Sequence, residues 1–305
     1  MSSKVYDTVI IGFGPAGYTA GIYATRYNLS TLIVGEEQGG LVAETPMIEN
    51  WPGDDKVNGI ELMEKMKKQY LRLGGLIENA KIQGICKNEV FELKTTDDGI
   101  IKAKSVIVAT GTRPRMLNVE GEEKFKGRGI SYCATCDAPF FKGKKVAIIG
   151  GGDSAFTSAL HLSQFVEKLY IIHRREEFRA QPAVVDKLRD KAGFILNKKP
   201  LRVEGKLKVE SLVMEDTKTG KEESLEVDGI FVQVGHIPTT ILASCLNIKL
   251  DKEGFIMVND QMETNVKGIF SAGDCTDGMN KMRQIITAAA MGAIAAESAY
   301  KFITK

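Results

Sequence analysis

The sequence predicts an α/β fold made of two doubly wound, Rossmann-like dinucleotide-binding domains, and two observations support this. The chain has 305 residues, enough for two domains of roughly 100 to 200 residues each. One pattern, an apolar strand followed by a glycine-rich turn and an Ala-rich helix, occurs at 5–25 and again at 145–165. The two copies lie about 140 residues apart, which is a domain period rather than the short period of a solenoid. Each copy is therefore expected to begin a domain of its own.

The composition is that of an ordinary soluble protein. Hydrophobic residues make up 43% of the chain, and 41 basic against 39 acidic residues give a formal net charge of +2. Without a long Lys/Arg run, nucleic acid is not expected as a partner. The apolar runs are shorter than the ~20 residues that span a bilayer, and the N-terminal residues lack an export-signal pattern. We therefore expect a cytoplasmic protein that binds neither nucleic acid nor membrane.

The first glycine-rich turn contains Gly12, Gly14 and Gly17. In a dinucleotide site the first glycine permits the tight turn, the second lets a pyrophosphate approach the backbone, and the third lets helix and strand pack closely. The N-terminus of the following helix offers free N–H groups and a partial positive charge to the phosphates. This turn predicts a dinucleotide site, with a plain glycine-rich turn as the alternative. The acid that usually ends the next strand is absent, because Gly35 stands there.

The second turn has small residues at the corresponding positions, Gly150, Gly152 and Ala155. A group of basic residues follows the next strand: His173, Arg174, Arg175 and Arg179. A dinucleotide with a 2′-phosphate needs cations at this place, whereas NAD is usually met by an acid. The pattern favours NADPH. The alternative is a solvated basic stretch that Glu176 and Glu177 offset.

A close cysteine pair, Cys133 and Cys136, lies between the two repeated units at 5–25 and 145–165. This spacing suits a redox disulfide or half of a zinc site, but zinc would need a second pair or nearby histidines, and the sequence has none there. A redox role is favoured over structural zinc or inert buried thiols, and no metal is expected. Asp137 follows directly and could move protons as the sulfurs cycle, with a turn residue as the alternative.

Near the C-terminus, an apolar strand ends at Asp274 and a helix rich in small residues follows. So many Ala and Gly side chains allow another group to approach the helix backbone closely. That group is either a bound cofactor or another helix of the core.

These motifs, taken in order, resemble the low-molecular-weight thioredoxin reductases from Val5 to the last helix. The matching elements are GFGPAG, ENWPG, ATGTRPR, CATCD, GGGDSA, HRREEFR, GHIP and GIFSAGDC followed by RQ. The resemblance implies a homodimeric enzyme in which an NADPH domain is inserted into an FAD domain and carries the dithiol. We expect the FAD domain at 1–115 and 246–305 and the NADPH domain at 116–245.

The resemblance also implies a path for electrons from NADPH through FAD to a thioredoxin-like or glutaredoxin-like protein. Cys136 would lie closest to the flavin and receive the electrons, Cys133 would exchange with the partner's disulfide, and Asp137 would handle protons. In such enzymes the two domains rotate between two arrangements. Gly111 and Gly235 are the expected hinges.

Three further residues are implied to contact FAD: Asp274 at the ribityl chain, Gln284 near the flavin ring and Asn50 on the FAD side of the site. The chain departs from the family at Leu41, where relatives commonly carry a glutamine, and at Pro139, which stiffens the loop beyond the thiols. The role of Cys275 stays open between a third thiol and a small buried residue. The alternative functions are an NADPH oxidase, a peroxiredoxin-linked reductase or a redox sensor without turnover.

Overall fold

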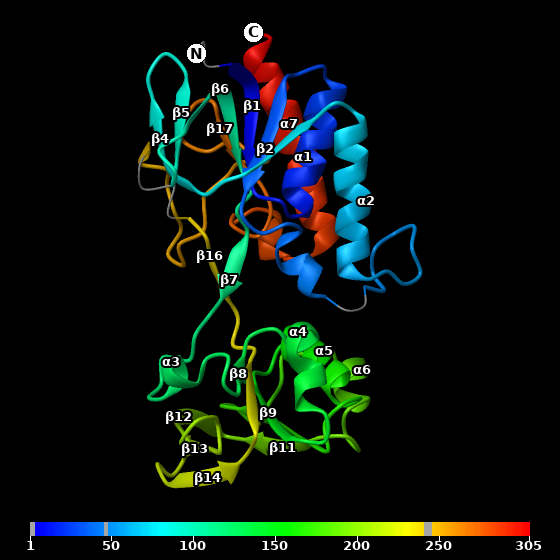
Figure 1. Ribbon diagram of the computed structural model, residues 1–305, viewed down its shortest axis with the longest axis vertical. Coiled ribbons are helices and arrows are strands. Elements are labelled where there is room, and N and C mark those ends of the chain that lie inside the picture. The colour runs from blue at the N-terminus through cyan, green and yellow to red at the C-terminus, as the bar shows by residue number, and fades with distance from the viewer. Residues whose placement is uncertain (1–3, 46–47, 241–245) are drawn as a thin grey trace. The chain divides into compact units, whose positions relative to one another are not determined.

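The computed structural model describes residues 4–45, 48–240 and 246–305. The chain divides into two compact units, here called the outer unit, Met1–Arg113 with Pro238–Lys305, and the inserted unit, Pro114–Ile237. The inserted unit thus interrupts the outer one in sequence (Figure 1). The sequence predicts these borders at 115/116 and 245/246, two and eight residues further along the chain than the structure places them. Residues 241–245, with Cys245, lie outside the described part of the chain.

The outer unit contains a seven-stranded sheet in the order β3-β2-β1-β6-β5-β4, with β17 paired to β6. The strands β3, β2, β1, β6 and β17 run parallel, and β4 and β5 are antiparallel additions. The bounds are β1 (Val5–Ile11), β2 (Thr31–Gly35), β3 (Leu76–Asn79), β4 (Ile82–Lys87), β5 (Phe91–Thr95), β6 (Ile100–Val108) and β17 (Ile269–Ser271). Side chains alternate across a strand, so successive residues of β1 enter different apolar clusters. Ile10 belongs to one cluster, and Val9 and Ile11 belong to the other.

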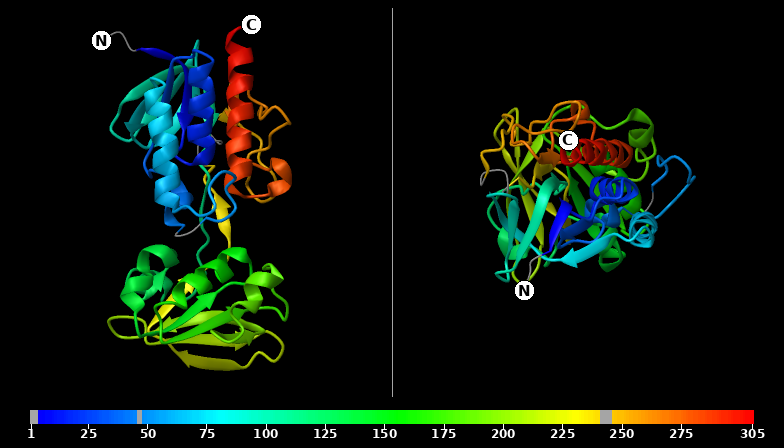
Figure 2. Two further views of the ribbon diagram at one scale, coloured as in Figure 1. Left: turned by 90° about the vertical axis from the view of Figure 1, so that its right-hand side faces the viewer. Right: turned by 90° about the horizontal axis from the view of Figure 1, so that it is seen from above.

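The helices α1, α2 and α7 lie together on one face of this sheet (Figures 1 and 2). Their bounds, with those of two short 3-10 helices, are α1 (Pro15–Arg26), η1 (Gly40–Glu44), α2 (Gly59–Arg72), η4 (Met279–Lys281) and α7 (Ile285–Ile303). A Cβ atom on Gly292 of α7 would lie 2.2 Å from the carbonyl oxygen of Ala16 in α1. Gly292 therefore lets α7 pack closely against α1, as expected under the second of the two alternatives left open by the sequence.

The inserted unit has a five-stranded parallel sheet in the order β11-β10-β9-β15-β8 and a three-stranded antiparallel sheet, β12-β13-β14. Its strands are β8 (Ile130–Ser131), β9 (Lys145–Ile149), β10 (Lys168–His173), β11 (Gly193–Leu196), β12 (Lys198–Glu204), β13 (Ser211–Asp216), β14 (Glu222–Glu226) and β15 (Gly229–Val232). Its helices are α3 (Glu122–Phe125), α4 (Ala134–Asp137), η2 (Ala138–Phe141), α5 (Asp153–Leu162) and α6 (Pro182–Asp186). Both units thus have the parallel sheet and glycine-turn arrangement that the sequence predicts.

The two segments that join the units, β7 (Thr112–Pro114) and β16 (His236–Pro238), form a two-stranded sheet. Gly111 and Gly235 precede these strands with φ of +61° and +104°, values that favour glycine. Their use as hinges stays a prediction. In the described part of the chain, no helix combines the length and the apolar character needed to cross a bilayer.

Candidate dinucleotide sites and redox centre

The first glycine turn, between β1 and α1, is held tight by the packing of two of its glycines. A Cβ atom on Gly12 would lie 2.2 Å from the Ala109 carbonyl oxygen, and one on Gly17 would lie 2.0 Å from the Gly12 carbonyl oxygen. Gly12 also has a φ of +119°, which side chains disfavour. These positions accept only glycine for reasons internal to the protein.

Gly14 is different, because nothing in the protein requires a glycine there. Its φ is −78°, and a Cβ atom on it would meet no atom within 4 Å. Gly14 is the N-cap of α1, and no side chain caps the helix. Open space therefore lies beside the uncapped N-terminus of a 12-residue helix, which fits the approach of a pyrophosphate to helix N–H groups.

The missing acid at the end of β2 has a packing reason. A Cβ atom on Gly35 would lie 3.1 Å from the ring of Phe13, which belongs to the glycine turn. Glu36 and Glu37 follow Gly35 in the sequence. Glu36 is exposed, and its carboxylate pairs with Lys81 Nζ at 3.1 Å. A side chain at position 35 would press on the Phe13 ring and hence on the turn.

Asp274 lies just beyond β17, where burial raises the pKa of its carboxyl and the positive charge of Arg283 partly opposes this. Among the described residues, no hydrogen bond to its side chain is found. A desolvated acceptor without a donor is costly. The site therefore suits a ligand that brings hydroxyl groups, as the ribityl chain of FAD does.

The structure brings together two more of the predicted FAD residues. Asn50 Nδ2 donates a hydrogen bond of 3.0 Å to Gln284 Oε1. Gln284 is the N-cap of α7 and takes part in a capping box with Thr287. Leu41 lies in η1, half-buried, and Cys275 is fully buried with its Sγ 3.5 Å from Ser271 Oγ.

The second glycine turn, between β9 and α5, repeats the geometry of the first. A Cβ atom on Gly150 would lie 2.3 Å from the Gln233 carbonyl oxygen and 2.8 Å from the Ala155 Cβ. A Cβ atom on Gly152, the N-cap of α5, would meet nothing within 4 Å. Here too, the middle glycine leaves open space next to a helix N-terminus, and this fits a second dinucleotide.

His173 ends β10 and is separated from the arginines that follow it. The side chain is only 8% exposed, and a Cβ atom on Gly151 would come within 2.4 Å of its ring. Burial lowers the pKa of His173, and a hydrogen bond with the Glu177 backbone works in the opposite direction. The structure thus places His173 beneath the glycine turn, where a neutral imidazole supports the loop, and not among the residues that line the adjacent pocket.

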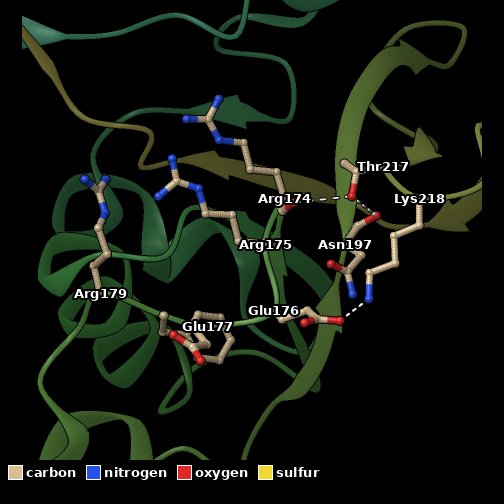
Figure 3. A pocket seen from close by; sticks show the side chains of 9 residues that line it. Arg174, Arg175, Glu176, Glu177, Arg179, Asn197, Thr217 and Lys218 are labelled. Atoms are coloured by element: carbon tan, nitrogen blue, oxygen red, sulfur yellow. Dashed lines mark hydrogen bonds and ion pairs between the residues drawn. The ribbon is translucent and has the colours of Figure 1, made fainter.

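Arg174, Arg175 and Arg179 are exposed and line a pocket of about 510 Å³ (Figure 3). The other lining residues are Glu176, Glu177, Phe178, Asn197, Thr217 and Lys218. Lys218 Nζ forms an ion pair with Glu176, 42 positions away in the sequence. A cationic pocket beyond β10 fits the 2′-phosphate of NADPH. Sequence reasoning missed Asn197, Thr217 and Lys218 because they lie in the β11–β12 and β13–β14 connections, far from the arginines in sequence, and carry no local signal.

The structure joins Cys133 and Cys136 in a disulfide with a Cα–Cα distance of 5.4 Å. Cys133 is the N-cap of the short α4, and its Sγ accepts a 3.1 Å hydrogen bond from the Cys136 N–H. Cys136 is exposed, whereas Cys133 and Asp137 are half-buried. Among the described residues, no group of three or more His, Cys, Asp or Glu side chains could hold a metal ion.

A buried carboxylate is hydrogen-bonded to the residue that precedes the dithiol. Glu122 is 2% exposed and accepts hydrogen bonds from the Leu117 and Asn118 N–H groups at 2.8 and 2.6 Å. It also accepts one of 2.6 Å from the hydroxyl of Tyr132, the residue before Cys133. Burial and this bond raise the pKa of Tyr132. The polypeptide leading into the dithiol is therefore tied to the first segment of the inserted unit.

The chain matches the family of pyridine nucleotide-disulphide oxidoreductases over residues 6–292. It is similar to the thioredoxin reductase of Bacillus subtilis (strain 168), with 39% identity over 304 residues that cover 98% of this chain and 95% of the relative. The thioredoxin reductase of Treponema pallidum (strain Nichols) is 40% identical over 303 residues, 98% of this chain and 97% of the relative. The crystal structure of Lactococcus lactis thioredoxin reductase matches with a TM-score of 0.94 and 39% identity, covering 98% of this chain and 99% of that one.

Proposed function

The chain belongs to the pyridine nucleotide-disulphide oxidoreductase family, and we propose that it is an FAD-containing, NADPH-dependent thioredoxin-disulfide reductase. One observation carries this conclusion. The Cys133–Cys136 disulfide belongs to a chain with two dinucleotide turns, and relatives of about the same length at 39 and 40% identity are named thioredoxin reductases.

We assign FAD to the outer unit. The turn at Gly12, Gly14 and Gly17 would hold its pyrophosphate, Asp274 would accept hydrogen bonds from the ribityl chain, and the Asn50–Gln284 pair would lie near the flavin ring. The open space at Gly14 and the unpartnered Asp274 carboxylate support this assignment.

We assign NADPH to the inserted unit. The turn formed by Gly150, Gly152 and Ala155 would hold its pyrophosphate, and the three pocket arginines would hold its 2′-phosphate. His173 supports the turn from below in this account. When bound, NADPH supplies a hydride and FAD passes the two electrons onward.

The reduced Cys133/Cys136 pair then takes part in thiol–disulfide exchange with the disulfide of the partner protein. Two electrons and two protons convert the Cys133–Cys136 disulfide into two thiols. Cys133 gives up its proton, and its thiolate attacks one sulfur of the partner's disulfide, whose other sulfur leaves and takes up that proton. This breaks the partner's S–S bond and forms a mixed disulfide. Cys136 displaces the partner by attacking Cys133, which restores the original disulfide and releases a dithiol. Asp137, next in the chain, would hold and return the proton of Cys136.

The partner is a thioredoxin or a thioredoxin/glutaredoxin-like protein. A homodimer and a cytoplasmic location are further parts of the proposal, and both derive from the family resemblance. An oxidase, a peroxiredoxin-linked reductase and a non-turnover sensor remain the competing functions.

The test is anaerobic mixing of the yellow protein with NADPH and then with oxidised thioredoxin, followed by flavin absorbance. Wild type should bleach with NADPH and recover on adding thioredoxin, whereas Cys136→Ser should bleach without recovering. A wild-type flavin that stays oxidised would contradict the NADPH assignment, and equal recovery of both proteins would contradict the dithiol role. In air, rapid peroxide formation without a disulfide substrate would favour the oxidase.

A further inference from the structure

We propose that Lys218 is a further determinant of nucleotide selectivity: it leaves Glu176 when NADPH binds and contacts the 2′-phosphate. This inference rests on the proposed function, because it adds a residue to the NADPH site. Figure 3 shows Lys218 reaching from the β13–β14 turn to Glu176 on the loop that carries the arginines. The pocket therefore has a second, independent wall opposite the loop after β10.

The turn that carries Lys218 is held beside the arginine loop by hydrogen bonds, one direct and one through Asn197, whose N–H donates to the Arg175 carbonyl at 3.4 Å. The Thr217 N–H donates to the Asn197 carbonyl at 2.8 Å, and the Thr217 hydroxyl lies 3.4 Å from the Arg174 carbonyl. The Asp216 carboxylate accepts hydrogen bonds from the Lys218 and Thr219 N–H groups at 2.9 and 2.8 Å. The Cα position of Lys218 is thus held beside the pocket, and only its flexible side chain has to move.

The present partner of Lys218 is easily exchanged. The Lys218 and Glu176 side chains are 58% and 63% exposed, and ion pairs as exposed as this contribute little to stability. The hydrogen bond and charge of Lys218 lower the pKa of Glu176, as does a hydrogen bond with Asn197, so the carboxylate is ionised at neutral pH. A phosphate with about two negative charges and several acceptor oxygens is a stronger partner for an ammonium group.

Glu176 determines the direction in which each substitution should change the affinity for a 2′-phosphate. A carboxylate in the pocket repels the 2′-phosphate but has no such effect on a nucleotide that carries a free 2′-hydroxyl. Lys218 could therefore act in two ways, by contacting the phosphate or only by neutralising Glu176. Substituting Lys218 in the wild-type protein and in a Glu176→Gln protein distinguishes these two roles.

The experiment measures binding of 2′,5′-ADP and of 5′-AMP to the FAD-loaded protein by titration calorimetry. The variants are Lys218→Met, Glu176→Gln, the double variant and a control, Lys199→Met. Lys199 lies on β12 of the same small sheet, is paired with Glu215 at 2.9 Å, and does not line the pocket. Calorimetry reports binding directly and does not depend on turnover.

Lys218→Met should weaken 2′,5′-ADP about fivefold to tenfold, as expected for one charge-assisted contact, and leave 5′-AMP unchanged. Glu176→Gln should tighten 2′,5′-ADP, and Lys218→Met should still weaken it about fivefold in the Glu176→Gln background. Loss of the Lys218 effect in that background, or equal effects on both nucleotides, overturns the proposal. If wild type does not prefer 2′,5′-ADP over 5′-AMP, the NADPH site of the proposed function fails as well.

Discussion

Asn50 and Gln284 are 234 positions apart in the sequence, yet the Asn50 amide donates a 3.0 Å hydrogen bond to the Gln284 side chain. Gln284 begins α7, which packs along α1, the helix of the first glycine turn. The bond therefore connects the loop before α2 to the two helices that flank the proposed FAD site. Two residues predicted only from the family resemblance are direct neighbours in the structure.

Removing this bond should loosen FAD without affecting the fold. We expect Asn50→Ala to weaken FAD binding by about fivefold, because one side-chain hydrogen bond is lost while the capping box of Gln284 with Thr287 stays intact. The measurement is the free FAD released on dilution and ultrafiltration. Asn88→Ala is the matched control, since Asn88 makes a similar exposed bond to Glu92 at 3.1 Å. Equal FAD release by both variants would show that Asn50 has no special role.

Substitutions at two glycines of the first turn should have different effects, one on folding and the other on FAD binding. Gly17→Ala should destabilise the apoprotein by about 1–3 kcal/mol or more, because its Cβ would overlap the Gly12 carbonyl oxygen. Gly14→Ala should leave the apoprotein as stable as wild type, because its Cβ meets no atom within 4 Å, and yet it should lose FAD. Thermal unfolding of the apoproteins and the ratio of flavin to protein absorbance measure the two effects. A Gly14→Ala protein that retains full FAD would contradict the pyrophosphate assignment.

Asp274 should make apoprotein stability depend on pH. Burial raises its pKa in the folded state, so the folded form binds the proton more tightly than the unfolded form. The stability contribution of Asp274 is therefore present below the unfolded pKa near 3.8 and is lost as pH rises through the higher folded value.

Asp274→Asn should accordingly raise the melting temperature of the apoprotein at pH 7 and remove this part of the pH dependence. It should also weaken FAD by about tenfold, because a neutral amide accepts hydroxyl hydrogen bonds less strongly. Melting curves from pH 4 to 8 and an FAD titration provide the measurements. If the variant is less stable than wild type at pH 7, the carboxylate has a favourable partner in the folded protein, which contradicts this account.

The parts of the site that sequence could predict are those encoded within one local segment. Gly12, Gly17 and Gly150 are recognisable because strand, turn and helix follow one another directly. His173 shows the limit: it precedes two arginines and looks like part of a basic group, but as the last residue of β10 it points into the protein beneath Gly151. Lys218 gives no local signal, because strand pairing brings its hairpin to the pocket.

The buried Glu122 carboxylate leads to the last prediction, on the stability of the inserted unit. All three of its recorded partners are donors, the N–H groups of Leu117 and Asn118 and the hydroxyl of Tyr132. Glu122→Gln keeps the shape but turns one oxygen into an NH₂ group that faces a donor. We expect a loss of about 1–3 kcal/mol, as for a buried polar group left without its partner, measured by urea unfolding of the holoprotein.

Tyr132→Phe should cost less, about 0.5–1.5 kcal/mol, because it removes one hydrogen bond and leaves both backbone bonds to Glu122 in place. Tyr170→Phe, a hydroxyl deletion on β10 of the same unit, is the control for the change of residue type. Because Tyr132 adjoins Cys133, both Glu122→Gln and Tyr132→Phe should also change the rate at which iodoacetamide alkylates the reduced dithiol, while Tyr170→Phe should not. If Tyr132→Phe matches its control in both stability and alkylation, the hydrogen bond from Tyr132 to Glu122 does not position the redox centre.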